Sequence, residues 1–205
     1  MKNAIPNICT TDYSIALTST AANLIPQKST VGEISNVKKN KTVAYIILDD
    51  EYIKKSNMRD ILVTYLKDNS QEPIHLIYLT NSQLKKFQTK KAVELFPLYH
   101  EIGHIHYEHL LKQGQKNQND IRNSRMSAIK NNTLTIEEKQ ADYFATVHFN
   151  PTIAIKALTK LKEARAEYDY QRGVLGKTMS NLALKEYDIR IKAIEANFKN
   201  RPSNK

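Results

Sequence analysis

The sequence is poor in the residues that build disulfide-rich, glycine-rich or proline-rich proteins. Its 205 residues include one cysteine, Cys9, no tryptophan, five glycines and six prolines. A single cysteine excludes an intrachain disulfide framework and a cysteine-based zinc cluster. Glycine and proline together make up roughly 5% of the chain, against about 12% in average proteins. Because tight turns need these residues, the composition argues against a many-stranded sandwich or barrel and favours helices.

Long hydrophobic runs are also missing. The longest run without a charged residue, Tyr13–Gln27, is interrupted by serine, threonine and asparagine, so it is too short and too polar to span a bilayer. Pro6 and Asp12 stand where a secretory signal peptide would have its apolar core. We therefore expect a soluble, cytoplasmic protein without a membrane partner.

The charge is strongly basic but scattered. There are 31 lysines and arginines against 21 acidic residues, a formal net charge of +10. The positive residues occur as separate lysine pairs and along the last third of the chain, and no run is long enough to indicate an RNA- or DNA-binding module. We expect this charge to cover solvated helices and to attract acidic protein partners, with no direct nucleic-acid module.

The first half of the chain divides into an arm and the start of a domain. Residues 1–40 are polar and show no sustained period, which predicts an irregular N-terminal arm, and residues 41–200 are predicted to form a single domain. Two short, mostly apolar, β-rich runs at 42–48 and 74–79 indicate buried strands. Between them, apolar residues at helical spacing predict a helix over 56–66.

The second half reads as helical. A long apolar helical pattern predicts a helix around 95–111, which begins at Pro97 or is kinked there. Residues 112–135 are polar and predict a mobile connection. Further helices are expected at 136–149, 152–172 and 177–199. The fold class is therefore α+β, with a small sheet packed on the helix around 95–111 and a helical C-terminal half.

Four of the six histidines fall within ten residues, and two of them belong to an H-E-x-x-H motif, His100-Glu101-Ile102-Gly103-His104. Residues four apart on a helix share a face, so His100 and His104 could bind one cation. Glu101 is rotated by about 100° from His100, so it would miss the metal and reach a water molecule bound to it. The other two histidines of this group, His106 and His109, are expected to be solvated or helix-end residues.

A catalytic zinc also needs a third protein ligand. Glu138 and Asp142 are again four apart, on the helix predicted at 136–149. One could bind the metal while the other accepts a hydrogen bond from the outer nitrogen of a ligating imidazole. Glu137 competes with Glu138 for the ligand role. Small residues, Gly103 on the first helix and an alanine on the second, would let the two helices approach closely.

These two motifs, with the continuation Tyr143-Phe144-Ala145 and a proline at position 151, resemble the active-site signature of the gluzincin metallopeptidases. Within these they are most similar to the ImmA/IrrE-type metallo-endopeptidases, and the resemblance covers roughly residues 92–151. It implies a zincin-like fold with one Zn²⁺. It further implies the roles of five residues: His100, His104 and Glu138 as zinc ligands, Glu101 as general base, and Asp142 as the partner of a ligating imidazole.

The resemblance also bears on substrate binding. Small gluzincin domains hold the substrate backbone on an edge strand, which would make Ile74–Leu79 the substrate strand. Some related peptidases carry a His-Pro…Arg-Ile element near the C-terminus, of which Tyr187-Asp188-Ile189-Arg190-Ile191 could be a remnant lacking the His-Pro. The group that stabilises the oxyanion is therefore open, with Tyr187, Arg190 and His148 as candidates.

Three functions follow from these observations. The first is a zinc-dependent endopeptidase that cuts a specific protein, such as a transcriptional repressor, which the resemblance implies. The second is a zinc-binding regulatory or antirepressor protein that acts by protein binding without turnover, against which the intact Glu101 argues. The third is a structural helical protein in which the motif is accidental.

Overall fold

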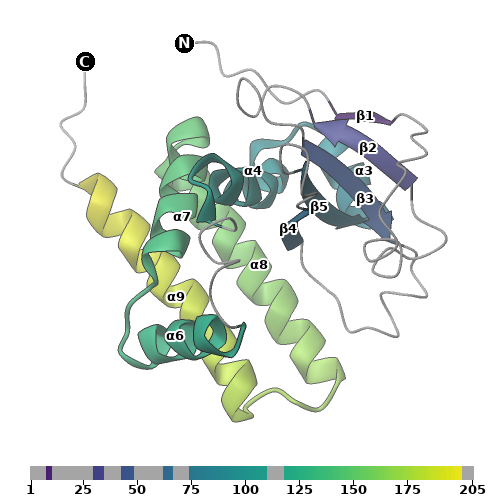
Figure 1. The fold of residues 1–205 in the computed structure, drawn as a ribbon. Coiled ribbons are helices and arrows are strands. Elements are labelled where there is room, and N and C mark those ends of the chain that lie inside the picture. The colour runs from purple at the N-terminus through teal and green to yellow at the C-terminus, as the bar shows by residue number, and fades with distance from the viewer. Residues whose placement is uncertain are drawn as a thin grey trace.

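The computed structural model describes residues 8–10, 30–34, 43–48, 62–66, 74–109 and 118–199. Within these ranges strands come first along the chain and helices follow (Figure 1). The strands are β1 (Ile8–Thr10), β2 (Thr30–Ile34), β3 (Val43–Leu48), β4 (Leu62–Leu66) and β5 (Ile74–Thr80). The helices are α3 (Asn81–Gln88), α4 (Ala92–His106), α6 (Gln118–Lys130), α7 (Ile136–Phe149), α8 (Pro151–Gln171) and α9 (Thr178–Lys199).

The strands are hydrogen-bonded in the order β1-β2-β3-β5-β4. β3 and β5 run parallel, with Val43 opposite His75, and the other neighbouring pairs are antiparallel. On its other side β5 pairs with β4, where Leu62 lies opposite Tyr78. β5 therefore has a hydrogen-bonded neighbour on each side, and the expectation that Ile74–Leu79 is an edge strand open to a substrate is wrong.

Two further predictions about the first half of the chain are changed by the structure. Residues 62–66 form β4 and not the end of a helix, because Leu-Val-Thr-Tyr-Leu favours extended backbone and pairing with β5 outweighs the helical spacing. Residues 56–61 lie outside the described ranges. β1 and β2 fall within residues 1–40, where we expected an irregular arm, since strands this short leave little period to detect.

The helices α3 and α4 begin and end at identifiable signals. The Thr80 side chain caps α3 in a capping box with Gln83, at distances of 3.0 and 2.8 Å. α4 runs without interruption from Ala92 through Pro97. It ends at His106 and not near residue 111, because Glu108 adopts a left-handed conformation with φ of 60°. The predicted extension of this helix past 106 is therefore wrong.

The helices of the second half follow the sequence more closely. Thr135 caps α7, and its hydroxyl accepts from the backbone N–H of Glu138 at 3.5 Å. Asn150 ends α7 and caps α8 through the N–H of Ile153 at 2.9 Å. α7 has the predicted bounds and α8 and α9 lie within one residue of theirs, so the helical C-terminal half is confirmed.

The expected mobile connection over 112–135 is wrong for its central part, which forms α6. Most of this helix is polar and exposed, and Ile129 is its one buried residue within the described part of the chain. An apolar stripe this sparse gives almost no helical period, and for that reason the sequence did not reveal the helix. Residues 110–117, between α4 and α6, lie outside the described ranges.

α4 lies at the centre of the fold, between the strands and the remaining helices (Figure 1). One face of β5 and the apolar side chains of α4 share a core with α8 and α7. Its most deeply buried members are Ile77, Leu79, Leu95, Phe96, Leu98, Ile105, Ala145, Ala154 and Leu158. Among the described residues, none of the helices combines the length and the apolar character that a bilayer crossing requires. The central position of α4 means that side chains on its remaining face are held by a rigid core.

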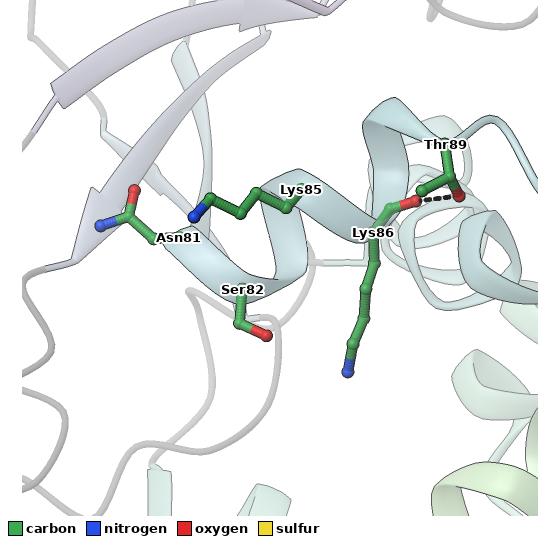
Figure 2. A pocket seen from close by; sticks show the side chains of 5 residues that line it. All are labelled: Asn81, Ser82, Lys85, Lys86 and Thr89. Atoms are coloured by element: carbon green, nitrogen blue, oxygen red, sulfur yellow. Dashed lines mark hydrogen bonds between the residues drawn. The ribbon is translucent and has the colours of Figure 1, made fainter.

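A shallow hollow on the outside of α3 lies apart from the histidines. It is lined by polar and basic side chains, Asn81, Ser82, Lys85, Lys86 and Thr89 (Figure 2). Thr89 is tied to its own helix, since its hydroxyl donates to the Lys86 carbonyl at 2.6 Å. The hollow contains no acidic, histidine or cysteine side chain, so it offers nothing that would bind a transition metal.

Candidate metal centre

The H-E-x-x-H motif lies on the second half of α4, as its spacing predicts. His100 and His104 project from one side of the helix, and their Nε2 atoms are 3.2 Å apart. His100 is buried, with 6% of its surface exposed, and His104 is partly exposed. Pro97, one turn earlier, does not interrupt the helix. The two imidazoles are therefore fixed by a helix whose opposite face is packed in the core.

α7 brings a carboxylate to the same point. It crosses α4 at Gly103, where a Cβ atom would lie 2.9 Å from the Cα of Ala141 and 3.1 Å from its carbonyl oxygen. The close approach predicted from these small residues is therefore present. It places Glu138, which is 7% exposed, beside the two imidazoles. Glu138 Oε2 is 3.4 Å from His100 Nε2, and Glu138 Oε1 is 4.0 Å from His104 Nε2.

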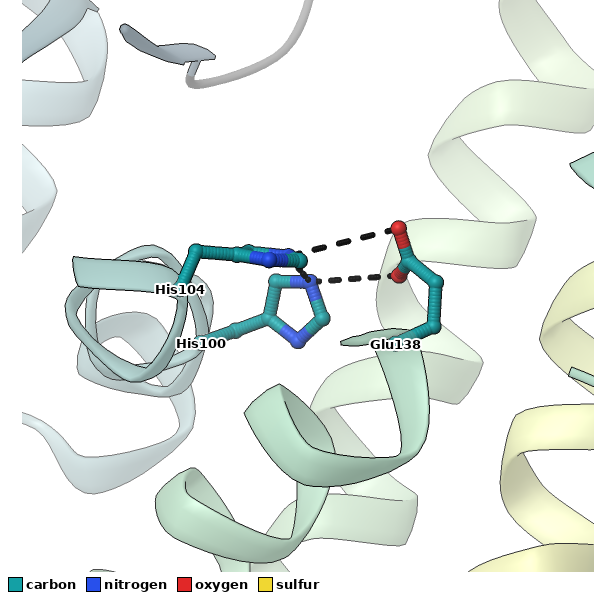
Figure 3. Close-up of side chains that lie close together, drawn as sticks. All are labelled: His100, His104 and Glu138. Carbon is teal, nitrogen blue, oxygen red and sulfur yellow. Dashed lines mark hydrogen bonds and ion pairs between the residues drawn. The ribbon is translucent and has the colours of Figure 1, made fainter. Parts of the chain in front are cut away.

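These three side chains converge as metal ligands would (Figure 3). Ligand atoms placed tetrahedrally about 2.0–2.1 Å from a zinc ion stand roughly 3.3 Å apart. The distances from His100 Nε2 to His104 Nε2 and to Glu138 Oε2, 3.2 and 3.4 Å, are close to this value, and the 4.0 Å from His104 Nε2 to Glu138 Oε1 is longer. Glu138 Oε2 is buried and accepts no hydrogen bond. A buried carboxylate oxygen without a donor is costly unless a cation neutralises it, so His100, His104 and Glu138 form a group that could bind a metal ion.

The outer nitrogen of His100 meets a buried ion pair. Asp142 Oδ1 accepts from His100 Nδ1 at 2.8 Å, and Asp142 Oδ2 accepts from Arg190 Nε, on α9, at 2.8 Å. Burial and the Arg190 guanidinium both lower the pKa of His100, but the carboxylates of Asp142 and Glu138 outweigh them and raise this pKa to about 9. Burial raises the pKa of Asp142, but Arg190 and His100 lower it more. Without metal, the His100 ring is therefore protonated on both nitrogens and positively charged at neutral pH.

The outer nitrogen of His104 meets a second imidazole, which in turn contacts an amide. Its Nδ1 lies 2.9 Å from Nδ1 of His109, and His109 Nε2 lies 2.8 Å from Oε1 of Gln140, on α7. His109 is 2% exposed, so the expectation that it is a solvated helix-end residue is wrong. Burial, together with the charge of His100, lowers the pKa of His104 to about 3. His104 is therefore neutral wherever the protein is folded.

The third side chain, Glu138, is neutralised in part by an arginine from α6. Arg125 Nη1 lies 3.2 Å from Glu138 Oε1, and its Nη2 lies 2.7 Å from Oε1 of Glu186 on α9. Burial raises the pKa of Glu138, but His100, whose Nε2 is 3.4 Å from Oε2, and the Arg125 charge hold it well below its usual value. Glu138 is therefore ionised at neutral pH, as a metal ligand must be.

Glu101 follows the first histidine and lies outside this convergent group of three. Burial is the main cause that raises the pKa of its carboxyl to about 7, and the nearby Glu138 carboxylate adds to the rise. A carboxyl group with a pKa close to neutral is suited to exchange protons at physiological pH. Its place next to His100 and its raised pKa are both properties expected of a general base at this site.

The remaining candidates are placed as follows. Glu137 is not among the side chains that converge, so Glu138 occupies the ligand position. Arg190 is committed to Asp142 and lies beside the ring of Tyr187, at 5.9 Å. His148 donates from Nδ1 to the carbonyl of Phe144 at 2.8 Å. Both Arg190 and His148 are therefore hydrogen-bonded to groups of the protein, Arg190 also to the outer nitrogen of His100 at 3.1 Å.

Sequence reasoning missed two residues of the site, Arg125 and Gln140. Arg125 lies in the polar segment that we expected to be a mobile connection, so nothing in the sequence marked it. Gln140 stands between Glu138 and Asp142, and its position two residues after a ligand was the only signal. Comparison with known protein families, with characterised proteins and with solved structures gave no significant match.

Proposed function

We propose that this protein is a zinc-dependent endopeptidase, in which His100, His104 and Glu138 hold one Zn²⁺ and Glu101 is the general base. The observation that carries the proposal is the convergence of two imidazole nitrogens and one ionised carboxylate, with an adjacent carboxyl whose pKa is about 7. Three protein ligands leave the fourth position of a tetrahedral ion open, as in catalytic zinc sites.

The residues divide the chemistry between them. A bound zinc ion would polarise the peptide carbonyl and lower the pKa of a water molecule to about 7. Glu101 accepts the proton of the attacking water and passes it to the amine that leaves. Asp142 and the His109–Gln140 pair hold the two imidazoles in place, so that their Nε2 atoms need no rearrangement. The buried core under α4 keeps this geometry rigid.

The resemblance to ImmA/IrrE-type peptidases extends the proposal to fold, location and target. We interpret α4, α7 and the strands beside them as a zincin-like domain of a cytoplasmic protein. The target would be one specific protein, such as a transcriptional repressor. This part is an analogy, since the site geometry supports the chemistry and does not identify the substrate.

The test compares Glu101, on α4, with Glu137, on α7, each of which is next in the sequence to a proposed ligand. We expect purified protein to bind one equivalent of zinc and to cleave a mixed-sequence peptide library, read by mass spectrometry. Glu101→Gln should still bind zinc but cleave about 10²–10⁴-fold more slowly. Glu137→Gln, which removes a carboxylate beside the site but not in it, should change neither property.

Two results would contradict the proposal. One is protein that takes up far less than one equivalent of zinc. The other is unchanged cleavage by zinc-loaded Glu101→Gln. If biological activity survives Glu101→Gln but is lost in His100→Ala, the protein instead acts by zinc-dependent protein binding without turnover. If a chelator changes neither the melting temperature nor any activity, the motif is accidental.

A further inference from the structure

The chain beyond α4 bends so that His109 returns to His104. Five residues along an uninterrupted helix correspond to a rotation of about 500°, which would place the two side chains roughly 140° apart. The structure avoids this because α4 ends at His106 and Glu108 takes a left-handed conformation, with φ of 60°. A non-glycine residue in this conformation is uncommon and is usually held there by its surroundings. The bend buries His109 against His104.

The hydrogen bonds that join His104, His109 and Gln140 determine which ring nitrogens carry hydrogen atoms. A carbonyl oxygen only accepts, so Gln140 Oε1 requires that Nε2 of His109 carries the hydrogen. In a neutral imidazole the other nitrogen, Nδ1 of His109, is then an acceptor. It faces Nδ1 of His104 at 2.9 Å, so His104 must donate from Nδ1. The lone pair of His104 is therefore on Nε2, the atom that faces His100 and Glu138.

We propose that His109 and Gln140 are positioning residues that hold His104 as its Nδ1–H tautomer, with Nε2 free to bind a metal ion. The inference deepens the proposed function and rests on its metal site. Gln140 lies two residues after Glu138, so α7 both supplies one ligand and orients another. His109 and Gln140 are an imidazole and an amide, whereas a carboxylate and a guanidinium, Asp142 and Arg190, lie behind His100.

The first measurement needs no metal. Two-bond proton–nitrogen correlation by NMR on metal-free protein should show His104 as the Nδ1–H tautomer. Gln140→Met should give a mixture of tautomers, because His109 loses its acceptor. Wild-type protein with His104 mainly in the Nε2–H form would overturn the proposal.

The second measurement is zinc affinity, by competition with a chromophoric chelator. Gln140→Met and His109→Phe should each bind zinc about 10–100-fold more weakly than the wild type, the usual effect of losing an outer partner of a ligand. The matched controls are Gln171→Met, at an exposed glutamine of α8, and His148→Phe, at a histidine of α7 bonded to its own helix. Neither control should change the affinity.

The outcomes separate this inference from the proposed function. Wild-type zinc affinity in both Gln140→Met and His109→Phe, with the fold intact by circular dichroism, would overturn it. If zinc affinity falls as expected while no peptide is cleaved by any variant, His109 and Gln140 keep their role and the peptidase proposal fails. The absorption spectrum of Co²⁺-substituted protein gives an independent check, since a mispositioned His104 should alter the tetrahedral ligand-field bands.

Discussion

His100 and His104 stand one helical turn apart on α4, yet the protein surrounds them with different chemistry. A carboxylate and a buried arginine lie behind His100, whereas an imidazole and an amide lie behind His104. The pKa of His100 is raised to about 9 and that of His104 is lowered to about 3. Two histidines of one candidate metal site therefore have pKa values that their surroundings shift in opposite directions.

The difference has a physical reason. A negatively charged partner makes the imidazole a stronger electron-pair donor to a metal ion. The buried Asp142 carboxylate then needs its own counter-ion, which Arg190 provides. A neutral partner fixes orientation without adding charge to the interior. Since Glu138 already brings one negative charge, the combination gives the site two carboxylates, each with an arginine neighbour. The predictions below test this contrast between a charged and a neutral support.

The largest expected effect comes from the charged side. Asp142→Asn leaves Arg190 buried without a counter-ion, and breaking such a pair costs about 3–5 kcal/mol. We expect this loss in the free energy of unfolding of metal-free protein, measured by urea denaturation. Gln140→Met, on the neutral side, should cost about 1 kcal/mol, the net contribution of an ordinary hydrogen bond. Equal losses from the two variants would show that charge does not distinguish the two supports.

Gly103→Ala should disturb both sides together, because Gly103 lies between the two histidines. The added methyl group would stand 2.9 Å from the Cα of Ala141 and would force α4 and α7 apart. Overpacking of this kind costs about 1–3 kcal/mol, partly offset by a gain of about 1 kcal/mol in helix propensity. Ser124→Ala, at an exposed position of α6, is the control and should not destabilise the protein. An increase in stability of Gly103→Ala would contradict the close helix contact.

The stability of the metal-free protein should fall as the pH rises, whereas its affinity for zinc should increase. The pKa of His100 in the folded, metal-free protein is about 9, above its usual value of 6.5, so its protonation stabilises the fold below pH 6.5 and this contribution is lost as the pH rises to 9. Zinc must displace that proton, so zinc affinity should rise about tenfold per pH unit between pH 7 and 9.

Titration of zinc affinity in this range, together with urea unfolding of metal-free protein, would measure both slopes. Glu101, whose carboxyl pKa is raised to about 7, loses its contribution to stability as the pH rises from 4.5 to about 7, so most of its effect falls below this window. Asp142→Asn should flatten the dependence of zinc affinity on pH, while Gln140→Met should leave it unchanged. A flat profile in the wild type would show that His100 does not hold the proton.

The smallest expected effect on stability comes from Arg125, which contacts Glu138 and not the histidines. Arg125 is half-exposed, and its bonds to Glu138 and Glu186 are screened by water. Arg125→Gln should therefore cost less than about 1 kcal/mol in zinc-loaded protein, measured by urea denaturation. The cost should be greater without zinc, because Glu138 then loses its nearest cation. If zinc makes no difference to the effect of Arg125→Gln, zinc does not neutralise Glu138.

The sequence predicted the parts of the site that depend on spacing within one helix. His100 with His104, and Glu138 with Asp142, are pairs four apart, and a helix places each pair on one side whatever the rest of the fold does. The start of the helix at 136 was predicted for the same reason, because its cap at Thr135 depends only on neighbouring residues. The helices after α7 likewise follow from long periodic patterns, which are the strongest signal in a sequence.

The remainder depends on contacts that no local pattern contains. His109 contacts His104 only because the chain turns at Glu108, and α6 has too few apolar residues to show a period. Arg190 had been noted as a candidate for another role, but its partner is 48 positions away in the sequence. The strand at 62–66 forms because β5 is beside it, against the helical spacing of its own residues.

The position of Arg190 in the chain has a consequence for synthesis. It lies on α9, after every other group that surrounds the two histidines, and proteins are made and begin to fold from the N-terminus. A growing chain that has completed α4 and α7 therefore holds Asp142 without its cation until α9 has emerged and packed. The Asp142–Arg190 pair behind His100 is therefore completed only when α9 has packed, after α4 and α7 have formed.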